Sequence, residues 1–214
     1  MKLIDKRQEP HEWTEYRQTP GAVYESKIYL RKALYVEQGG ICAYCMQRLD
    51  NELQESIVTT NRIEHIKCRE RNANLQLDYQ NMVICCKGKL KENINGPDFI
   101  SCDLKKGNED IHFSPFDPNF ISSLSYNRRE GKILSSRADF QKDINDVLNL
   151  NNGLLKRNRA STFKGIRNIL GNNSWKSSQI NKMIEHWNAR DKDGLYKPFC
   201  GMVVWYLEEK LSCY

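Results

Sequence analysis

The strongest constraint on this sequence comes from cysteines that lie far apart in the chain. Cys42 and Cys45 are separated by two residues, Cys85 and Cys86 are adjacent, and Cys102 comes sixteen residues after Cys86. A two-residue spacing lets a tight turn present two thiolates to one zinc ion. Cys102 can still form a second pair with Cys85 or Cys86 across the long loop between them, because the entropy of loop closure rises slowly with loop length. The spacing therefore predicts a structural zinc site that joins two distant segments.

The remaining cysteines do not point to a disulfide framework. The sequence starts with charged residues instead of the apolar core of a signal peptide, and disulfides are rare in chains that stay in the cytosol. Cys68, Cys200 and Cys213 are therefore expected to be ordinary small hydrophobic residues. A redox dithiol at Cys42 and Cys45 is disfavoured, because the βαβ surroundings typical of such motifs are missing.

Length and hydropathy define the broad class of protein. The chain has 214 residues, of which 39% are hydrophobic, and this is enough to bury a core in one large domain or two small ones. No apolar stretch approaches the roughly 18 residues that a membrane span requires. We therefore expect a cytoplasmic protein with no membrane partner.

Turn residues divide the sequence into three regions. Residues 1–38 form an N-terminal helical segment, in which Gly39-Gly40 ends a helix at about 24–38. Residues 39–113 contain the cysteine and histidine motifs. Residues 114–214 are expected to form a hairpin followed by a helical C-terminal domain.

The C-terminal region has clear local patterns. Two short strands at 124–126 and 132–134 flank a turn at 129–131. Helical spacing follows in four segments, the last of which is apolar almost all round. This last helix belongs either in a deep core or in an interface with another protein. The helical segments are 140–148, 154–170, 179–190 and 200–211.

Positive charge is concentrated in one part of the chain. The net charge is only +6, but no acidic residue occurs between Asp146 and Glu185. On the helix at 154–170, Arg157, Lys164 and Arg167 fall on one face. Such a stripe suits a phosphate backbone, although a solvated helix face has the same pattern. The residues on the opposite, apolar face are Leu155, Thr162, Phe163, Ile166 and Ile169.

The dipeptide Glu64-His65 follows an extended-looking run and should end a strand. An isolated histidine is usually structural, but this one lies between the two cysteine pairs. Histidine has a pKa near neutrality, which suits a residue that takes a proton from water. The sequence therefore predicts an acid-histidine site beside the zinc site.

Taken together, these motifs resemble the HNH (ββα-metal) endonuclease family. A narrower similarity to the HNH subunits of Septu and retron-associated anti-phage defence systems extends to residues 144–155 and 199–207. The motif residues are Gln38-Gly39-Gly40-Ile41-Cys42-Ala43-Tyr44-Cys45, Ile63-Glu64-His65-Ile66, Tyr79-Gln80-Asn81-Met82-Val83-Ile84-Cys85-Cys86 and Cys102-Asp103-Leu104-Lys105-Lys106-Gly107.

The resemblance implies an α+β fold, with a ββα-metal core and zinc knuckle at 39–113 embedded in a mainly helical chain. It implies that His65 is the general base and that Asn81 braces the loop between two strands. Glu64 and Asp103 would bind the catalytic Mg²⁺ or Mn²⁺. Asp103 stands where the family usually has His or Asn, so Asn108 and His112 remain alternatives for completing the metal shell.

The resemblance also selects the zinc ligands. The family's asparagine normally precedes the third knuckle cysteine by five residues, which favours Cys86 over Cys85. The implied Zn²⁺ ligands are Cys42, Cys45, Cys86 and Cys102.

The implied activity is metal-dependent hydrolysis of phosphodiester bonds, with DNA favoured as substrate. The subgroup implies an antiviral effector nuclease that forms a complex with an ATPase subunit. An RNA-cleaving nuclease (of tRNA, for example) and a non-catalytic zinc-knuckle module that binds nucleic acid remain the alternatives. Six residues are expected to bind nucleic acid: Lys67, Arg69, Lys106, Arg157, Lys164 and Arg167.

Overall fold

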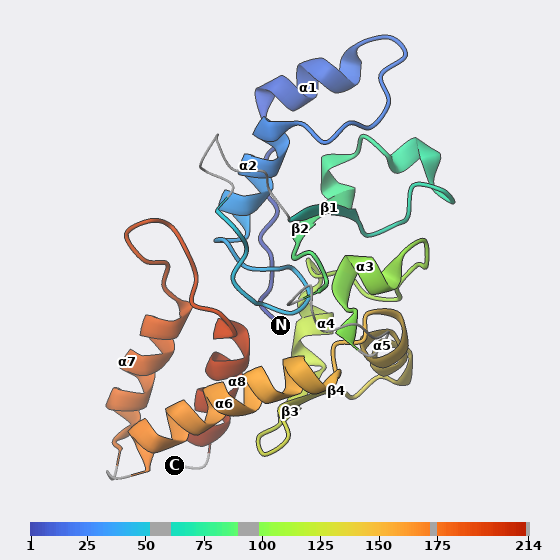
Figure 1. Cartoon of the computed structure of the whole chain (residues 1–214). Helices are drawn as coiled ribbons and strands as arrows, with labels where there is room; N and C mark the ends of the chain where they lie inside the picture. Colours follow the sequence, from blue (N-terminus) through green and yellow to red (C-terminus); the bar gives the residue numbers. More distant parts are fainter. Residues whose placement is uncertain (52–60, 90–98, 172–174, 213–214) are drawn as a thin grey trace.

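The computed structural model describes residues 1–51, 61–89, 99–171 and 175–212. These residues form a mixed α+β structure in which helices are joined by two small antiparallel sheets (Figure 1). The helices are α1 (His11–Gln18), α2 (Ile28–Glu37), α3 (Cys102–Lys106), α4 (Pro118–Ser122), α5 (Ala138–Lys142), α6 (Gly153–Leu170), α7 (Ser177–Asn188) and α8 (Cys200–Leu211).

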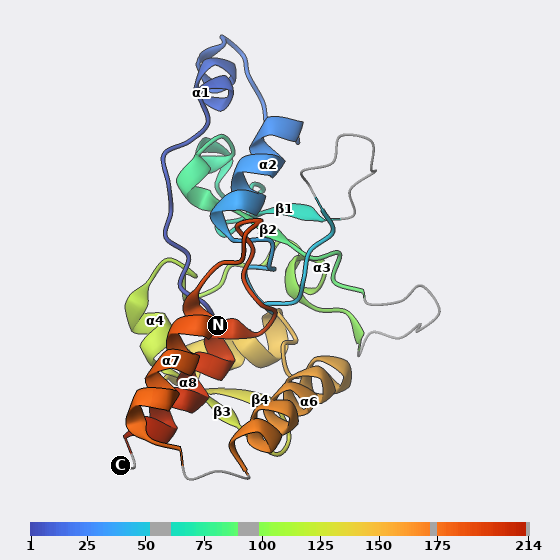
Figure 2. The same ribbon diagram turned by 90° about the vertical axis from the view of Figure 1, so that its left-hand side faces the viewer.

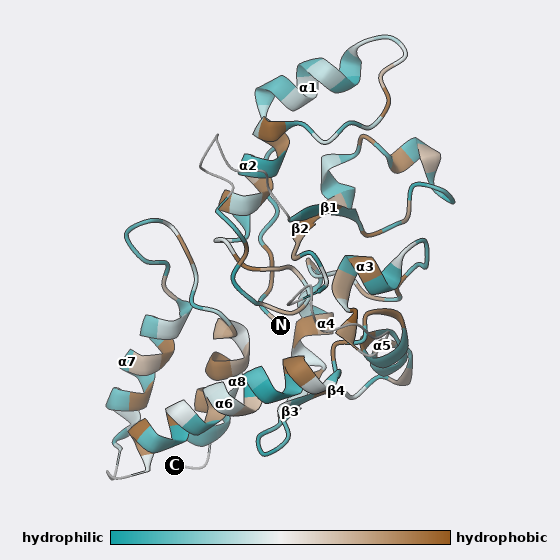
Figure 3. Ribbon diagram, in the orientation of Figure 1, coloured by the Kyte–Doolittle hydropathy of each residue, from teal (hydrophilic) through white to brown (hydrophobic). Residues whose placement is uncertain are grey.

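The first sheet carries the acid-histidine dipeptide. β1 (Arg62–His65) pairs with β2 (Met82–Cys85), with Glu64 opposite Val83 and His65 opposite Met82. The prediction that Glu64-His65 ends a strand is therefore confirmed. β2 is buried along its whole length, which its apolar residues permit. Figure 3 shows the hydrophobic β2 beside the hydrophilic β1. Between these strands lie the 3₁₀ turns Ala73–Leu75 and Tyr79–Asn81.

α2 begins later than predicted but ends where Gly39 and Gly40 require. Both glycines have positive φ, at +62° and +66°, which few other residues adopt without strain. They also allow a close approach, because a Cβ on Gly39 would lie 2.5 Å from the Tyr196 ring and one on Gly40 would lie 2.8 Å from the Leu195 side chain. The connection between α7 and α8 therefore packs directly on the turn that precedes the first cysteine pair.

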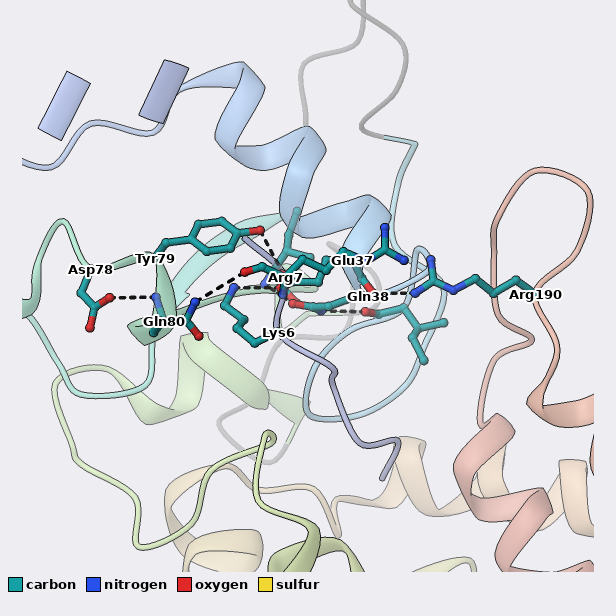
Figure 4. A network of polar contacts seen from close by, with 10 residues as sticks. Lys6, Arg7, Glu37, Gln38, Asp78, Tyr79, Gln80 and Arg190 are labelled. Atoms are coloured by element: carbon teal, nitrogen blue, oxygen red, sulfur yellow. Dashed lines mark hydrogen bonds and ion pairs between the residues drawn. The ribbon is translucent and has the colours of Figure 1, made fainter. Parts of the chain in front are cut away.

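A polar network links an N-terminal segment and the connection between α7 and α8 to the end of α2 (Figure 4). The Glu37 carboxylate accepts hydrogen bonds from Lys6 Nζ at 2.8 Å, from the Arg7 backbone N–H at 2.7 Å and from the Tyr79 hydroxyl at 3.1 Å. The guanidinium of Arg190 donates to the Glu37 carbonyl at 2.7 Å. One side chain of α2 thus joins the N-terminal segment to the segment before β2, while its backbone receives the C-terminal region.

The C-terminal hairpin agrees with the prediction. β3 (Leu124–Asn127) and β4 (Lys132–Ser135) pair in antiparallel register. Gly131 closes the turn, and a Cβ there would lie 2.2 Å from the Lys156 carbonyl. The hairpin therefore rests against α6. A π-helical turn (Asp143–Val147) follows α5.

The last helix, α8, spans the predicted residues and lies in the core. Its buried side chains lie on more than one side of the helix, as its nearly uniform apolar surface predicts. Figure 2 shows α7 lying along α8. The buried side chains of α8 therefore lie in the core of the chain itself. The buried residues are Cys200, Met202, Val203, Val204, Tyr206 and Leu207.

The sequence did not predict α1. Pro10 stands at its N-cap, and Trp13 on its inner side is fully buried. One cluster of buried apolar side chains contains residues from all three regions of the sequence, among them Trp13, Tyr44 and Phe163. Among the described residues, no helix combines the length and apolarity needed to cross a bilayer.

Candidate functional site

Four cysteines from three separate segments come together in one cluster. The Sγ atoms of Cys42, Cys45, Cys86 and Cys102 all lie within 4.8 Å of one another. The Cys42–Cys102 distance is 3.8 Å and the Cys45–Cys86 distance is 3.7 Å. A tetrahedral zinc site with Zn–S bonds of about 2.3 Å has S–S separations of about 3.8 Å. The cluster therefore has the donor set and the spacing of a structural zinc centre.

Local backbone geometry sets these four positions. Cys42 and Cys45 lie on a tight turn, closed by the Met46 N–H donating to the Cys42 carbonyl at 3.0 Å. Cys86 directly follows β2, and the adjacent Cys85 is fully buried and outside the cluster. Neighbouring side chains of an extended chain point to opposite sides, so only one of the two joins the cluster.

Without a metal ion, the four cysteines do not ionise alike: against the effect of burial, hydrogen bonds with Cys102 and Cys45 hold the pKa of Cys42 well below its usual range. Hydrogen bonds with Cys42, Cys45 and Cys86 hold the pKa of Cys102 well above its usual range, and burial adds to this effect. A divalent cation reverses this balance, since it binds the thiolate form.

A cavity of about 580 Å³ is formed mainly by residues of β1, the turn that follows it, and α3. Glu64 and His65 both line it, as does Asp103, three of the residues singled out by the sequence. The full lining is Arg62, Ile63, Glu64, His65, Cys68, Arg69, Glu70, Asp103, Leu104, Gly107 and Asn108.

Glu64 is a buried acid that is paired with a lysine side chain. Its carboxylate contacts Lys106 Nζ at 2.8 Å and accepts a hydrogen bond from the Tyr44 hydroxyl at 3.1 Å. Burial and the neighbouring Asp103 raise the pKa of Glu64 to about 8, while the charge of Lys106 lowers it. Glu64 is therefore largely protonated at neutral pH, and a metal cation would have to displace this proton to bind the carboxylate.

Asp103 forms an ion pair with Arg62. Arg62 and Glu64 are two residues apart on β1, and Asp103 and Lys106 are three apart on α3, so each pair shares a face of its element. Two ion pairs thus connect β1 and α3: in one β1 supplies the cation, and in the other α3 does. Lys106 is fully buried, whereas the Arg62 side chain is 49% exposed, so only Arg62 is free to move outward.

His65 is held by its backbone neighbours and by an aromatic ring. Its Nε2 lies 3.0 Å from the Gln76 carbonyl oxygen, so Nε2–H donates and Nδ1 is left as the acceptor. The edge of the Tyr24 ring packs against it, with centroids 4.6 Å apart. Burial, together with the charges of Arg69 and Lys106, lowers the pKa of His65 to about 4. The imidazole is therefore neutral at pH 7, and its pKa is lower than the near-neutral value expected from the sequence, which makes it a weaker base than an ordinary histidine.

Asn81 binds the loop that follows His65. Its Oδ1 accepts from the Lys67 N–H at 2.8 Å, and its Nδ2 donates to the carbonyls of Lys67 at 3.0 Å and Leu75 at 3.3 Å. The Ile66 N–H also donates to the Asn81 carbonyl at 2.9 Å. One side chain thus fixes the segment that carries the histidine.

The residues that were expected to bind nucleic acid differ in their exposure to solvent. Lys67 and Arg69 are exposed, and Arg69 lies at the cavity with its guanidinium 4.5 Å from the Tyr24 ring centroid. The expectation for Lys106 is wrong, because its buried ammonium contacts Glu64 and donates to the His65 carbonyl at 3.1 Å. A lysine that is engaged inside the protein does not reach a nucleic-acid backbone.

The basic helix is α6, with Arg157 and Lys164 exposed on it. Arg167 is half-buried, and its guanidinium donates to the Arg128 carbonyl at 3.4 Å. The apolar face differs from the expectation at Ile169, which is 52% exposed. Near the helix end the core no longer covers it.

The two alternative ligands of the catalytic metal, Asn108 and His112, lie in different places. Asn108 lines the cavity. His112 does not; its Nδ1 lies 3.1 Å from the buried carboxylate of Asp143, which also accepts the His112 backbone N–H at 2.5 Å. Cys68 and Cys200 are buried as expected, and Cys213 lies outside the described residues.

Sequence reasoning missed four residues of the site. Tyr44, inside the first cysteine motif, and Arg62, two residues before Glu64 on the same strand face, carried positional signals that point to the site. Tyr24 and Gln76 gave no comparable signal, because one acts through ring packing and the other through its backbone carbonyl. Comparisons with known proteins add no assignment: no protein-family model matches the chain, and no curated protein gives a significant match.

Proposed function

We propose that this chain is a metal-dependent endonuclease of the HNH type that hydrolyses phosphodiester bonds in nucleic acid, with DNA as the favoured substrate. The observation that carries the proposal is the cavity in which His65, Glu64 and Asp103 lie together with the exposed cations Arg62 and Arg69. Asp103 directly follows Cys102 of the four-cysteine cluster. A binding module has no need for a neutral buried histidine beside two carboxylates.

In this proposal His65 is the general base. Its Nε2–H is held by the Gln76 carbonyl, and its low pKa keeps Nδ1 free of a proton at neutral pH. Nδ1 would accept a proton from the water that attacks phosphorus. The hydrogen bonds of Asn81 to Lys67 and Leu75 keep the loop after His65 in place. Ring orientation is thereby set before substrate arrives.

Glu64 and Asp103 would hold the divalent cation. Carboxylate oxygens are the ligands that Mg²⁺ and Mn²⁺ prefer, and both acids line the cavity. The cation supplies charge neutralisation at the scissile phosphate and the departing oxygen. Lys106 fixes the Glu64 carboxylate, and the Tyr44 hydroxyl does so from a second direction.

Exposed cations would bind the substrate backbone. Arg69 and Lys67 lie beside the histidine, and Arg157 and Lys164 lie on α6. Contacts with phosphate position a nucleic acid without reading its sequence, so cleavage should have little sequence preference. Replacing Arg157 and Lys164 by Gln should weaken binding evenly and lower the salt dependence by about one unit of slope for each lost phosphate contact.

We further propose that the chain works in an antiviral complex with a separate ATPase subunit, on the strength of the subgroup resemblance. Because α8 is engaged in the chain's own core, the contact would have to use another surface or the partly buried Trp205. Co-expression with the neighbouring gene product, followed by size-exclusion chromatography, tests this: separate elution of the two proteins would end the idea.

The nuclease proposal is tested by incubating the protein with plasmid DNA and with total RNA, in Mg²⁺, in Mn²⁺ and in EDTA. Cleavage of DNA that EDTA stops is the expected result. His65→Ala should reduce it by roughly 10²-fold to 10⁴-fold without changing zinc content. Cleavage of RNA alone would reassign the substrate. Binding of either nucleic acid without cleavage, or full activity of His65→Ala in a clean preparation, would overturn the mechanism.

A further inference from the structure

The buried guanidinium of Arg159 has no role in the function proposed above. Arg159 lies within the basic stretch of the sequence, yet its side chain is fully buried on the inner face of α6. Its Nε donates to the Gly131 carbonyl at 2.5 Å, and one terminal nitrogen donates to the Leu150 carbonyl at 2.6 Å and to Asn151 Oδ1 at 3.3 Å. The other terminal nitrogen has no hydrogen-bond partner among the described residues.

These contacts satisfy hydrogen bonds but do not neutralise charge. All three acceptors are neutral amide or peptide oxygens, and no described carboxylate forms an ion pair with Arg159. A guanidinium stays protonated in proteins, and an uncompensated buried charge is strongly destabilising. The interior of the protein should therefore contain an anion close to Arg159.

One short segment connects Arg159 with the four-cysteine cluster. The Cys102 N–H donates to the Leu148 carbonyl at 2.9 Å, and Asn149 Nδ2 donates to the Ile100 carbonyl at 2.9 Å. Arg159 binds the carbonyl of Leu150, the next residue along. Arg159 and Cys102 thus donate hydrogen bonds to two carbonyls of the same segment, those of Leu150 and Leu148.

The electrostatics agree with this arrangement. Burial lowers the pKa of Arg159 to about 10, and the nearby ionisable groups of Tyr126, Cys45 and Cys102 oppose that lowering. Among these groups, the two cysteines belong to the metal cluster. A Zn²⁺ ion with four thiolates carries a net charge of about −2, so it is the buried anion that Arg159 needs.

We infer that Arg159 is the internal counter-cation of the metal–thiolate centre formed by Cys42, Cys45, Cys86 and Cys102. This role rests on metal binding by the cluster and not on nuclease activity. A nearby positive charge stabilises thiolates relative to thiols and withdraws electron density from sulfur. Arg159 therefore acts as a positioning and tuning residue that keeps the zinc tightly held and the bound thiolates unreactive.

The test separates charge from hydrogen bonding with two variants. Arg159→Gln keeps amide donors but removes the charge, and Arg159→Lys keeps the charge. Arg157→Gln is the matched control, because it removes one cation from an exposed position on the same helix. The readouts are zinc affinity by chelator competition, the sulfur-to-metal charge-transfer band of the Co²⁺-substituted protein, and the rate of thiolate alkylation by iodoacetamide.

We expect Arg159→Gln to weaken zinc binding by roughly 10-fold to 100-fold, to move the charge-transfer band to lower energy and to speed alkylation. Arg159→Lys should restore most of the native band position, and Arg157→Gln should change none of the three. A folded Arg159→Gln with native band, affinity and alkylation rate would overturn the inference. Failure of both Arg159 variants to fold in zinc would also overturn it, since packing would then be the role; failure of Gln alone would support the charge requirement.

Discussion

The four-cysteine cluster and the Glu64–His65 cavity lie close together in the fold but have opposite electrostatic needs. The cluster brings together four ligands of one kind, and three of these cysteines are buried. In the cavity, by contrast, the acids Glu64 and Asp103 are already paired with Lys106 and Arg62. The cluster has no cation among its four side chains, whereas the cavity already contains two, Lys106 and Arg62.

This difference separates structural from catalytic metal binding. The cluster joins three segments of the chain, so metal binding there contributes to folding. The cavity keeps its shape through ion pairs between β1 and α3, so a metal ion must displace a proton and one partly exposed cation. A tight permanent ion is expected in the first site and an exchangeable one in the second.

The largest effect should come from removing a ligand of the cluster. Cys86→Ser should abolish tight zinc binding, and losing that metal costs on the order of 10 kcal/mol of folding free energy. Cys85→Ser is the matched control, because its side chain lies outside the cluster. Metal analysis and thermal unfolding of both variants decide the matter. Zinc loss by the Cys85 variant alone would reassign the third ligand and remove the contrast.

The next largest effect concerns the buried ion pair of the cavity. Lys106→Met should destabilise the protein by about 1–3 kcal/mol, because it leaves the buried Glu64 carboxyl and the His65 carbonyl without their hydrogen-bond partner. Lys106→Met combined with Glu64→Gln should recover part of that loss. Urea unfolding measures both. Lys105→Met, at an exposed neighbouring position, should have little effect; equal losses at the two lysines would contradict the internal role of Lys106.

The pKa of Glu64 makes cation binding in the cavity dependent on pH. Because burial raises this pKa to about 8, the carboxyl is protonated below that pH, and a divalent ion must displace the proton. The apparent affinity for Mn²⁺ should therefore rise about tenfold per pH unit between about pH 6 and 8 and then level off. Titration calorimetry measures this. Glu64→Gln should bind weakly with no such slope; a native protein whose affinity ignores pH would refute the prediction.

The smallest effect should come from the exposed cation of the cavity. Arg62→Gln frees Asp103 and should raise the affinity for Mn²⁺ about threefold, in keeping with the roughly 0.2–1 kcal/mol of a partly exposed pair. Lys105→Gln removes an equal charge from α3 outside the cavity lining and serves as the control. If both substitutions raise the affinity equally, net charge and not the Arg62–Asp103 pair is responsible.

Elements that depend on local pattern were predictable from the sequence. The hairpin at β3 and β4, the span of α8 and the glycine stop after α2 follow from turn residues and periodicity. The sequence pattern does not indicate α1, because Pro10 and Pro20 flank it and proline usually marks a break in a helix. Proline before the first turn of a helix is compatible with it, since the N–H it lacks has no partner there.

The sequence by itself determined the order and chemical type of the site residues: cysteines at metal-binding spacing, and an acid-histidine pair at a strand end. Only the tertiary structure decided which charged residues are buried. Lys106 and Arg159 look like surface cations in a one-dimensional pattern, yet both are enclosed. Burial of a charge depends on partners from distant segments, Glu64 for one and the neighbourhood of the cysteine cluster for the other. Local sequence does not contain that information, because the compensating group is brought near only when the chain folds.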